Sequence, residues 1–313
     1  MSRCLVIINP VSGGGAARRY ALDLQWKLST LFETIEVKFT TGEGDATRFA
    51  KDACERGFDA VFCMGGDGTV NETVNGIAQG GFKSTFGFIP VGTVNDMSRA
   101  LGIHQNPIQA IKRIDINQTR TIDIGRCNDK YFCNNIAAGV IPKVIEEVTP
   151  KEKSILGPLA YFLRAGQALF TTKDYTYRIK TENDDFICKS PLVLALLTNV
   201  VSSFERFMPE ASVDDGYMRI IIFKEYFILD ILSVLPLIIS GAIYNSGYTT
   251  TLTVKKASIE LLSNIDDLAT NMDGDPGPSM PVDIEVLPRV LKVFAPAKHK
   301  KKKALNLPKL PHI

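Results

Sequence analysis

Residues 60–76 read Ala-Val-Phe-Cys-Met-Gly-Gly-Asp-Gly-Thr-Val-Asn-Glu-Thr-Val-Asn-Gly, and this stretch decides the fold class. The apolar run at 60–64 predicts a buried strand, the glycine cluster predicts a tight turn, and the pattern from about Thr69 to Ala78 predicts a helix. An apolar strand that leads directly into a helix is typical of parallel sheets, which helices cover on both faces. The stretch therefore predicts one unit of an α/β sheet.

Similar units lie on both sides of this stretch. Apolar strands are predicted at 4–8, 35–39 and 86–90, and helical patterns run from about 13 to 32, from 46 to 56 and onward from about 95. Strands that alternate with helices imply crossover connections and a parallel sheet. We therefore expect an N-terminal α/β domain, residues 1–124.

After Thr121 the pattern changes to one that favours antiparallel strands. Tyr175–Thr181 alternates with period two and meets Phe186–Thr198 across a polar turn, which predicts a hairpin. Further strands are predicted at 218–223, 249–254, 258–263, 282–287 and 290–294, and helices around 159–170 and 227–244. We expect a mostly β C-terminal domain at 125–292, with the boundary near 122–127.

Composition excludes several classes of protein. The 313 residues are 45% apolar and 22% charged, which is ordinary for globular domains and argues against a disordered chain. Six cysteines without metal-ligand spacing predict reduced thiols in a cytoplasmic protein. The stretch 227–244 contains Asp230, Pro236 and Gly241, so a membrane-spanning helix is not expected.

The net charge of +2 argues against a nucleic-acid partner, but it hides an uneven distribution. Residues 298–313 hold six lysines and no acidic residue, which leaves −4 for the rest of the chain. Such a tail is typical of a disordered, solvated segment. It also suits a tether to anionic bilayers.

Three predicted strand-to-helix turns are rich in glycine and small polar residues. They are 9–15 (Asn-Pro-Val-Ser-Gly-Gly-Gly), 65–69 (Gly-Gly-Asp-Gly-Thr) and 92–96 (Gly-Thr-Val-Asn-Asp). Such turns share the carboxyl edge of a parallel sheet, where glycine backbone and helix N-termini accommodate phosphate. Each turn alone is typical of an ordinary βα connection, but together the three favour nucleotide binding.

The familiar nucleotide motifs are absent. No Walker-type G-x-x-x-x-G-K-[ST] occurs, and Asn71 stands where the Rossmann pattern needs a third glycine. The acidic Asp67 within the turn would repel bare phosphate, so it suits contact with a ribose or with a phosphate-bound Mg²⁺.

Two acidic turns follow in the second half, Asp214-Asp215-Gly216 and Asp273-Gly274-Asp275. Asp-Gly is a common hairpin turn, so both have a purely structural interpretation. The functional one assigns one carboxylate to Mg²⁺ and another to general-base catalysis on a hydroxyl. Of three histidines, two lie in the tail, which argues against a Ser-His-Asp hydrolase.

Several motifs together resemble the soluble bacterial diacylglycerol kinases and related lipid kinases of the superfamily that includes NAD kinases. They are Asn9-Pro-Val-Ser-Gly13, Gly44-Asp45-Ala46, the string from Gly65 to Gly76, Pro90-Val-Gly-Thr-Val-Asn-Asp96, Arg99-Ala-Leu101, Val213-Asp-Asp-Gly-Tyr217 and Asp273-Gly274. The match runs from residue 3 to about 296. The resemblance implies an NAD-kinase-like α/β domain, a β-rich domain, a cleft between them, and a final segment at about 293–300 that returns to the first domain.

The resemblance also implies site residues. ATP is expected to contact Asn9, Pro10, Val11, Ser12, Gly13, Thr40, Gly66, Asp67, Gly68, Thr69, Val70, Asn71, Glu72 and Thr93. Asp215, with main-chain oxygens of Ser212 and Tyr217, resembles the structural Mg²⁺ site of the family, and a second Mg²⁺ is expected on the ATP phosphates near Asp67. Position 275 departs from the family: the general base there is usually Glu, and Asp275 is one methylene shorter, or about 1.5 Å.

The function that the resemblance implies is transfer of the ATP γ-phosphate to the hydroxyl of diacylglycerol, which yields phosphatidic acid, with Asp275 as the base. One alternative keeps the nucleotide site but takes a sphingoid base, another glycerolipid or NAD as acceptor. A second alternative is a nucleotide-responsive regulatory or membrane-binding protein with little catalysis. A lipid acceptor requires peripheral contact with a membrane, for which the helices near 156–170 and 227–244 are candidates. The resemblance suggests a homodimer.

Overall fold

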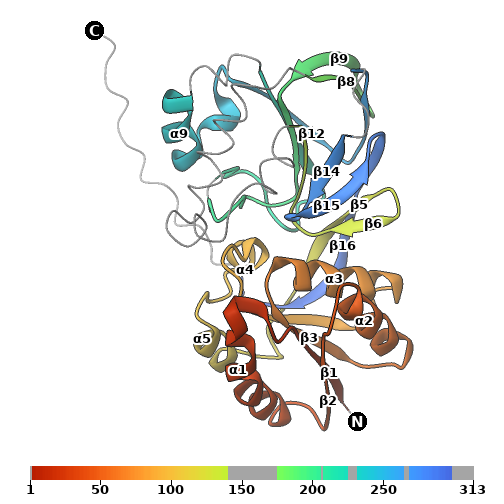
Figure 1. Cartoon of the computed structure of the whole chain (residues 1–313), viewed down its shortest axis with the longest axis vertical. Coiled ribbons are helices and arrows are strands. Elements are labelled where there is room, and N and C mark those ends of the chain that lie inside the picture. The colour runs from red at the N-terminus through yellow and green to blue at the C-terminus, as the bar shows by residue number, and fades with distance from the viewer. Residues whose placement is uncertain (1, 140–174, 206, 225–230, 264–267, 298–313) are drawn as a thin grey trace.

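The computed structural model describes residues 2–139, 175–205, 207–224, 231–263 and 268–297 (Figure 1). The N-terminal half alternates strands and helices in the predicted order. Its elements are β1 (Arg3–Ile8), α1 (Ser12–Ser29), β2 (Thr34–Phe39), α2 (Asp45–Glu55), β3 (Ala60–Gly65), α3 (Asp67–Gln79), β4 (Thr85–Pro90), α4 (Asp96–Leu101) and α5 (Pro107–Lys112). Strands β2, β1, β3 and β4 lie side by side in that order, and all three pairings are parallel, which confirms the predicted sheet.

The central strand β3 explains why this half folds as it does. All six of its residues are buried, because helices cover both faces of the sheet. Val61 and Cys63 pack into the core beneath α2 and α3, whereas Phe62 and Met64 pack into the core beneath α1 and α5. Because successive side chains of a strand point to opposite faces of the sheet, β3 contributes to two separate apolar cores.

The second half is built from antiparallel strands. They are β5 (Thr119–Cys127), β6 (Lys130–Phe132), β7 (Asn135–Gly139), β8 (Tyr175–Thr181), β9 (Asp185–Ser190), β10 (Leu192–Leu196), β11 (Met218–Phe223), β12 (Thr249–Val254), β13 (Lys256–Leu261), β14 (Ala269–Met272), β15 (Asp275–Ser279) and β16 (Val282–Phe294), with helix α9 (Ile231–Ser240) and the short η2 (Ile243–Asn245). One sheet has the order β12-β11-β10-β7-β14-β15. These observations confirm an α/β N-terminal part followed by a β-rich C-terminal part (Figure 1).

The last strand, β16, joins the two halves. At one end Val293 pairs with Phe86 of β4 in parallel, and along its length the strand pairs with β5 and β13 in antiparallel fashion. The sheet of the N-terminal half therefore continues through β16 into β13, β8 and β9. Its register with β5 shifts between Leu287 and Leu291, where Arg289 has a left-handed φ of 51°, which marks a bulge.

Two strand predictions need correction. Phe186–Thr198 is not one strand, because β9 and β10 belong to different sheets and are separated by Pro191, which has no N–H to donate. The hydroxyl of Ser190 bonds to Leu192 and Phe223 at this crossing. Conversely, the strands expected at 282–287 and 290–294 are the single strand β16, which the bulge interrupts. The helix expected around 159–170 lies outside the described residues.

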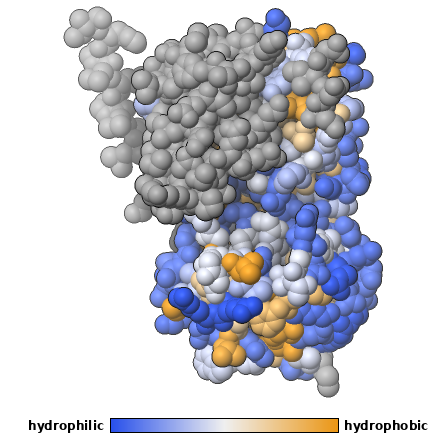
Figure 2. All heavy atoms as spheres, in the orientation of Figure 1, coloured by the Kyte–Doolittle hydropathy of each residue, from blue (hydrophilic) through white to orange (hydrophobic). Residues whose placement is uncertain are grey.

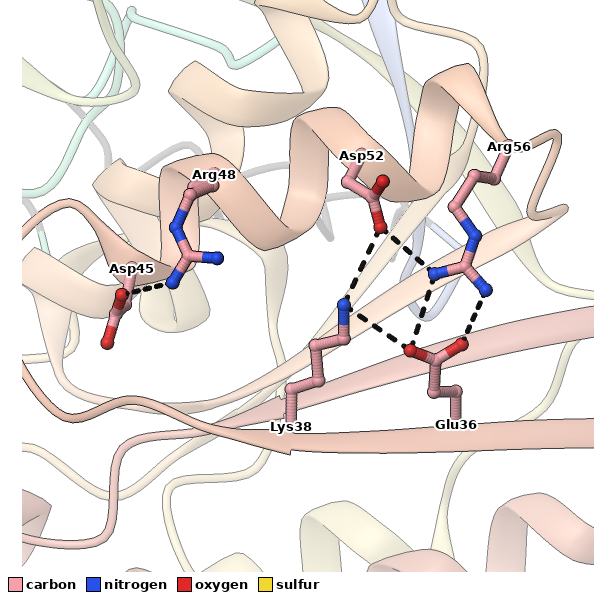
Figure 3. A network of polar contacts seen from close by, with 6 residues as sticks. All are labelled: Glu36, Lys38, Asp45, Arg48, Asp52 and Arg56. Carbon is pink, nitrogen blue, oxygen red and sulfur yellow. Dashed lines mark hydrogen bonds and ion pairs between the residues drawn. The ribbon is translucent and has the colours of Figure 1, made fainter.

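An ion-pair network fixes the edge strand β2 to helix α2 (Figure 3). Lys38 contacts Glu36 at 3.3 Å and Asp52 at 3.5 Å, and Arg56 bonds to the same two carboxylates. Because these side chains are partly exposed, each pair contributes only about 0–1 kcal/mol. All six cysteines are free, and five of them are buried. Across the described ranges, no helix has both the length and the apolar character that a membrane crossing requires.

Candidate active site

The three glycine-rich turns meet at the carboxyl edge of the parallel sheet, as predicted from the strand order. The backbone N–H of Asn9 donates to the carbonyl of Met64 at 3.0 Å, and its side-chain amide donates to the hydroxyl of Thr69 at 3.1 Å. The turns at 66 and 92 approach so closely that a Cβ on Gly92 would lie 2.8 Å from the Cα of Gly66. Glycine is therefore required where these two turns cross.

A cavity of about 950 Å³ opens beside these turns. Six of the residues predicted to contact ATP line it: Asn9, Pro10, Val11, Thr40, Thr69 and Glu72. Its volume lies within the range of small-molecule sites. The cavity thus brings together residues from the turn after β1, the end of β2 and helix α3, which lie far apart in the sequence.

The other predicted contact residues lie outside the cavity lining: Ser12, Gly13, Gly66, Asp67, Gly68, Val70, Asn71 and Thr93. Val70 is buried in the core beneath α2 and α3. The side chain of Asn71 donates to Asp273 at 2.8 Å and to the carbonyl of Tyr131 at 3.3 Å. In this structure, Val70 packs in the core and Asn71 bonds to the C-terminal half.

Several residues that line the cavity were not predicted. Arg18 and Leu22 contribute one face from α1, and Phe39 contributes another from the end of β2. Leu22 is 77% exposed and Phe39 48%, so apolar surface borders the opening. On the face shown in Figure 2, hydrophobic patches lie among hydrophilic ones on the N-terminal half. These residues could not be found from the sequence, because the exposure of Leu22 and Phe39 is seen only in the folded structure.

The Gly44-Asp45 motif shapes the wall of the cavity. Gly44 has a left-handed φ of 81°, which lets the chain turn into α2. The Asp45 carboxylate accepts the backbone N–H groups of Thr41 and Gly42, at 2.8 and 3.2 Å, and also bonds to Arg48 (Figure 3). These bonds lower the pKa of Asp45 well below its usual range, so the side chain stays ionised and holds the cavity loop.

Asp67 has a role that the sequence did not reveal. Its two carboxylate oxygens accept the backbone N–H groups of Asn95 and Asp96, at 2.8 and 2.9 Å. The side chain therefore caps helix α4 and ties the second glycine-rich turn to the third. Burial raises the pKa of Asp67, although these two hydrogen bonds oppose the shift.

Asp96 links the two halves of the molecule. Its carboxylate accepts the backbone N–H groups of Ser202 and Ser203, at 2.8 and 2.7 Å, and the side-chain amide of Asn134 at 3.1 Å. Ser202 and Ser203 both have left-handed φ angles, 49° and 72°. Burial raises the pKa of Asp96 to about 6, and the neighbouring carboxylate of Asp67 adds to the shift.

Asp273 is a second link between the halves. Its carboxylate accepts four N–H groups, from the side chain of Asn71 and the backbone of Cys133, Asn134 and Asn135, at 2.6 to 2.9 Å. Burial raises its pKa, and the four hydrogen bonds oppose that shift. With every oxygen engaged in this way, Asp273 positions the turn that presents Asp275.

Asp275, the predicted general base, lies against the first turn of α3. A Cβ on Gly68 would lie only 3.0 Å from its Oδ2 atom. Partial burial raises the pKa of Asp275, and so do the nearby carboxylates of Asp273, Glu72 and Asp67. Within the described ranges, no hydrogen-bond donor contacts this carboxylate, so it is available to accept a proton.

The three predicted metal ligands form one turn that an arginine closes. Atom Nη1 of Arg219 contacts both carboxylate oxygens of Asp215, at 2.9 and 2.7 Å, and the carbonyl of Tyr217 at 3.2 Å. The Asp215 carboxylate also accepts the backbone N–H of Ser212. Among the described residues, no group of three or more His, Cys, Asp or Glu side chains is arranged to hold a metal. Arg219 thus contacts the oxygens of Asp215 and Tyr217 that the prediction assigns to Mg²⁺, and the metal assignment itself stays a prediction.

Comparison with known proteins identifies the family of this chain. Residues 3–127 match the family model described as the diacylglycerol kinase catalytic domain. Residues 134–295 match the model of the YegS C-terminal NAD kinase beta sandwich-like domain. The chain belongs to the diacylglycerol kinase family. It is accordingly a kinase, a phosphotransferase with an alcohol group as acceptor, and the resemblance predicted from its motifs is confirmed.

Individual relatives within the diacylglycerol kinase family span the whole fold. The chain is 34% identical over 294 residues to a diacylglycerol kinase of Staphylococcus epidermidis, covering 94% of this chain and 92% of the relative. It is 35% identical over 301 residues to a protein of Streptococcus pneumoniae serotype 4 described as a "Putative lipid kinase", with 95% and 99% covered. A crystal structure of a diacylglycerol kinase from Bacillus anthracis has the same fold, with a TM-score of 0.79, 24% identity and coverage of 94% and 97%.

Proposed function

We propose that this kinase transfers the γ-phosphate of ATP to the hydroxyl of diacylglycerol and so forms phosphatidic acid. Relatives described as a diacylglycerol kinase and as a lipid kinase support a lipid acceptor. The observation that carries the proposal is the position of Asp275 at the N-terminal turn of α3, since the same helix lines the nucleotide-sized cavity through Thr69 and Glu72. The proton acceptor and the nucleotide site thus lie against the same helix, α3.

The cavity suits ATP in both polar and apolar respects. Asn9, Thr40 and Thr69 supply hydrogen-bonding groups, and Arg18 supplies a cation that can pair with phosphate. The exposed surfaces of Leu22 and Phe39 supply apolar area for the base. Mg²⁺ would arrive with ATP as part of the substrate, and there it would neutralise phosphate charge during transfer.

The proposed chemical step uses Asp275 as the general base. The acceptor oxygen attacks the γ-phosphorus, the bond from that phosphorus to the β-γ bridging oxygen breaks, and ADP leaves. The hydroxyl proton passes to the Asp275 carboxylate. A pKa above the ordinary aspartate value makes this carboxylate a stronger base, yet it remains ionised whenever the pH exceeds that pKa.

The test is an assay of purified protein with Mg·ATP and mixed micelles that contain diacylglycerol, followed by identification of the lipid product. We expect phosphatidic acid from the wild type and a loss of about 100-fold or more in kcat for Asp275→Asn. Asp185→Asn, which changes an exposed aspartate of β9, is the matched control and should keep full activity. Failure to phosphorylate any lipid acceptor would refute the proposal.

Asp275→Glu tests whether the shorter side chain is adapted to this site. A large gain in kcat would indicate that aspartate is a weakened base, whereas a loss would show that the turn at 273–275 places the shorter carboxylate correctly. Asp67→Ala should abolish activity as well, because it removes the cap that holds the turn at 95–96.

The relative from Streptococcus pneumoniae is described only as a lipid kinase, so the acceptor needs its own test. A panel of diacylglycerol, monoacylglycerol, a sphingoid base and NAD, each at a matched concentration, distinguishes the candidate acceptors by product. We expect diacylglycerol to give the highest kcat/KM. If ATP binds but no acceptor is phosphorylated, the chain is a nucleotide-responsive regulatory protein instead. The predicted homodimer and the predicted peripheral membrane contact stay predictions.

A further inference from the structure

The turn at residues 212–217 is held by the guanidinium group of Arg219. Three oxygens converge on its Nη1 atom: Oδ1 and Oδ2 of Asp215, and the carbonyl oxygen of Tyr217. The side chain of Arg219 is only 12% exposed. Because arginine stays protonated at any physiological pH, this is a permanent, largely buried positive charge.

Charged side chains of both signs gather around the turn. Asp123, Asp214 and Asp215 supply three carboxylates. Arg120 contacts the Asp214 carboxylate at 3.7 Å, Arg289 donates to the Asp214 carbonyl, and Arg219 pairs with Asp215. Among the described residues, three guanidinium groups thus lie at this turn beside the three carboxylates, and that of Arg219 directly engages both oxygens of Asp215.

The carboxylates are also engaged by the backbone. Asp215 accepts the N–H groups of Ser212 and Tyr217, at 3.1 and 3.0 Å. Asp123 accepts the N–H of Gly216 at 2.6 Å and the N–H of Arg289, in the bulge of β16, at 2.8 Å. The turn is therefore tied to β5, to β11 and to β16 by contacts that the chain itself supplies.

We propose that Arg219 takes the place of a structural divalent cation, so that the turn at 212–217 is ordered without metal. Mg²⁺ needs nearly ideal octahedral coordination at 2.0–2.1 Å. The oxygens of Asp215 and Tyr217 could serve among its ligands only if the guanidinium group left them. The cation that organises this turn is covalently part of strand β11. The proposal concerns the fold of the C-terminal half and does not depend on which acceptor the kinase uses.

The proposal predicts which variants respond to magnesium. Without nucleotide, the Tm of the wild type should be the same in EDTA and in MgCl₂. Arg219→Ala should lower the Tm in EDTA and should regain about 3 °C or more at saturating MgCl₂, because the freed Asp215 oxygens can then bind the ion. Arg219→Lys keeps the positive charge and should remain insensitive to magnesium.

Two controls isolate the site. Arg178→Ala breaks an Arg–Asp pair on the exposed face of β8 and should create no response to magnesium. In the double variant with Arg219→Ala and Asp215→Asn, the gain in Tm with MgCl₂ should disappear. If Arg219→Ala shows no such gain, the oxygens around Arg219 are not a cation position and the proposal is wrong.

A measurement on the wild type keeps the proposal testable even if Arg219→Ala fails to fold. Full-length protein without nucleotide is titrated with Mn²⁺, and the bound ion is counted by electron paramagnetic resonance. We expect the wild type and Asp215→Asn to bind the same number of ions. A wild-type ion that Asp215→Asn loses would show that a metal, not Arg219, occupies the turn and would overturn the proposal.

Discussion

Gly68 matters because of the carboxylate beside it. A methyl group at this position would lie 3.0 Å from Oδ2 of Asp275, so the aspartate would have to move by a few tenths of an ångström. We expect Gly68→Ala to lower kcat by about 10-fold, because the base would be misplaced. Stability should stay equal or rise by up to about 1 kcal/mol, because alanine favours a helix over glycine.

The check is a comparison of kcat with the urea unfolding free energy for the same variant. Gly247→Ala is the control, since a Cβ there would meet nothing within 4 Å. If Gly68→Ala lowered the unfolding free energy as well as kcat, the loss of activity would reflect a damaged fold. Gly68 would then have no specific role in positioning Asp275.

Asp96 gives stability a measurable dependence on pH. Its pKa is about 6 in the folded protein and 3.8 in an ordinary aspartate, so folding favours the protonated form. The stability that this group contributes is complete below about pH 4 and is lost as the pH rises through 6. The unfolding free energy of the wild type minus that of Asp96→Asn should therefore fall by about 2 kcal/mol between pH 4 and pH 7.

Urea unfolding at several pH values measures this difference, and other titrating groups cancel in it. Asp185→Asn is the matched control with the opposite sign, because Arg178 lowers the pKa of Asp185. A difference for Asp96→Asn that does not change with pH would show that the Asp96 carboxyl titrates normally.

At the scale of residues, the position of the site was easier to predict from the sequence than the role of each residue in it. The convergence of the three turns follows from strand order alone, and six of fourteen predicted nucleotide contacts line the cavity. The capping role of Asp67 could not be predicted, because its partners Asn95 and Asp96 become neighbours only when β3 and β4 pair. Arg219 was missed for a similar reason, since its role depends on the conformation of the turn before it.

Helices α2 and α3 are in close contact at Gly76. A Cβ at this position would lie 2.2 Å from the carbonyl oxygen of Thr47 and 2.7 Å from the Cβ of Ala50. Gly76→Ala should therefore force the helices apart and destabilise the protein by about 1–3 kcal/mol. ATP affinity should also fall, because Ala46 of α2 and Glu72 of α3 hydrogen-bond to each other at the cavity.

Thermal unfolding and ATP titration of Gly76→Ala test both effects, again with Gly247→Ala as the reference. If Gly76→Ala proves as stable as the reference, the two helices can separate at no cost, and the close packing is not required by the fold.

Element boundaries were predictable wherever local pattern decides them. Strands such as Tyr175–Thr181 and Met218–Phe223 agree with prediction at both ends, because alternation and burial are encoded locally. The separation of β9 from β10 was not predicted, because apolar residues occur on both sides of Pro191 and only the pairing partners show that the two strands lie in different sheets. Short strands such as β6 were missed because three residues carry no periodic signal.

The whole molecule combines an acidic body with six lysines in residues 298–313, which lie outside the described residues. If this tail tethers the enzyme, its deletion should sharply weaken binding to anionic vesicles at low salt, because each lysine near the surface contributes about 1 kcal/mol. Vesicle co-sedimentation measures the effect, and neutral phosphatidylcholine vesicles are the control. Unchanged binding to anionic vesicles after deletion would exclude the tail as a tether.

The position of β16 constrains how the chain can be synthesised. Strand β4 is complete once residue 90 has left the ribosome, but the strand beside it, β16, ends only at Phe294. During the translation of some two hundred intervening residues, the edge of the parallel sheet remains without its native neighbour. An uncovered edge of this kind is where nascent chains associate wrongly. Emergence of strand β16, rather than of the first 124 residues, is therefore the event that completes the sheet of the nucleotide-binding half.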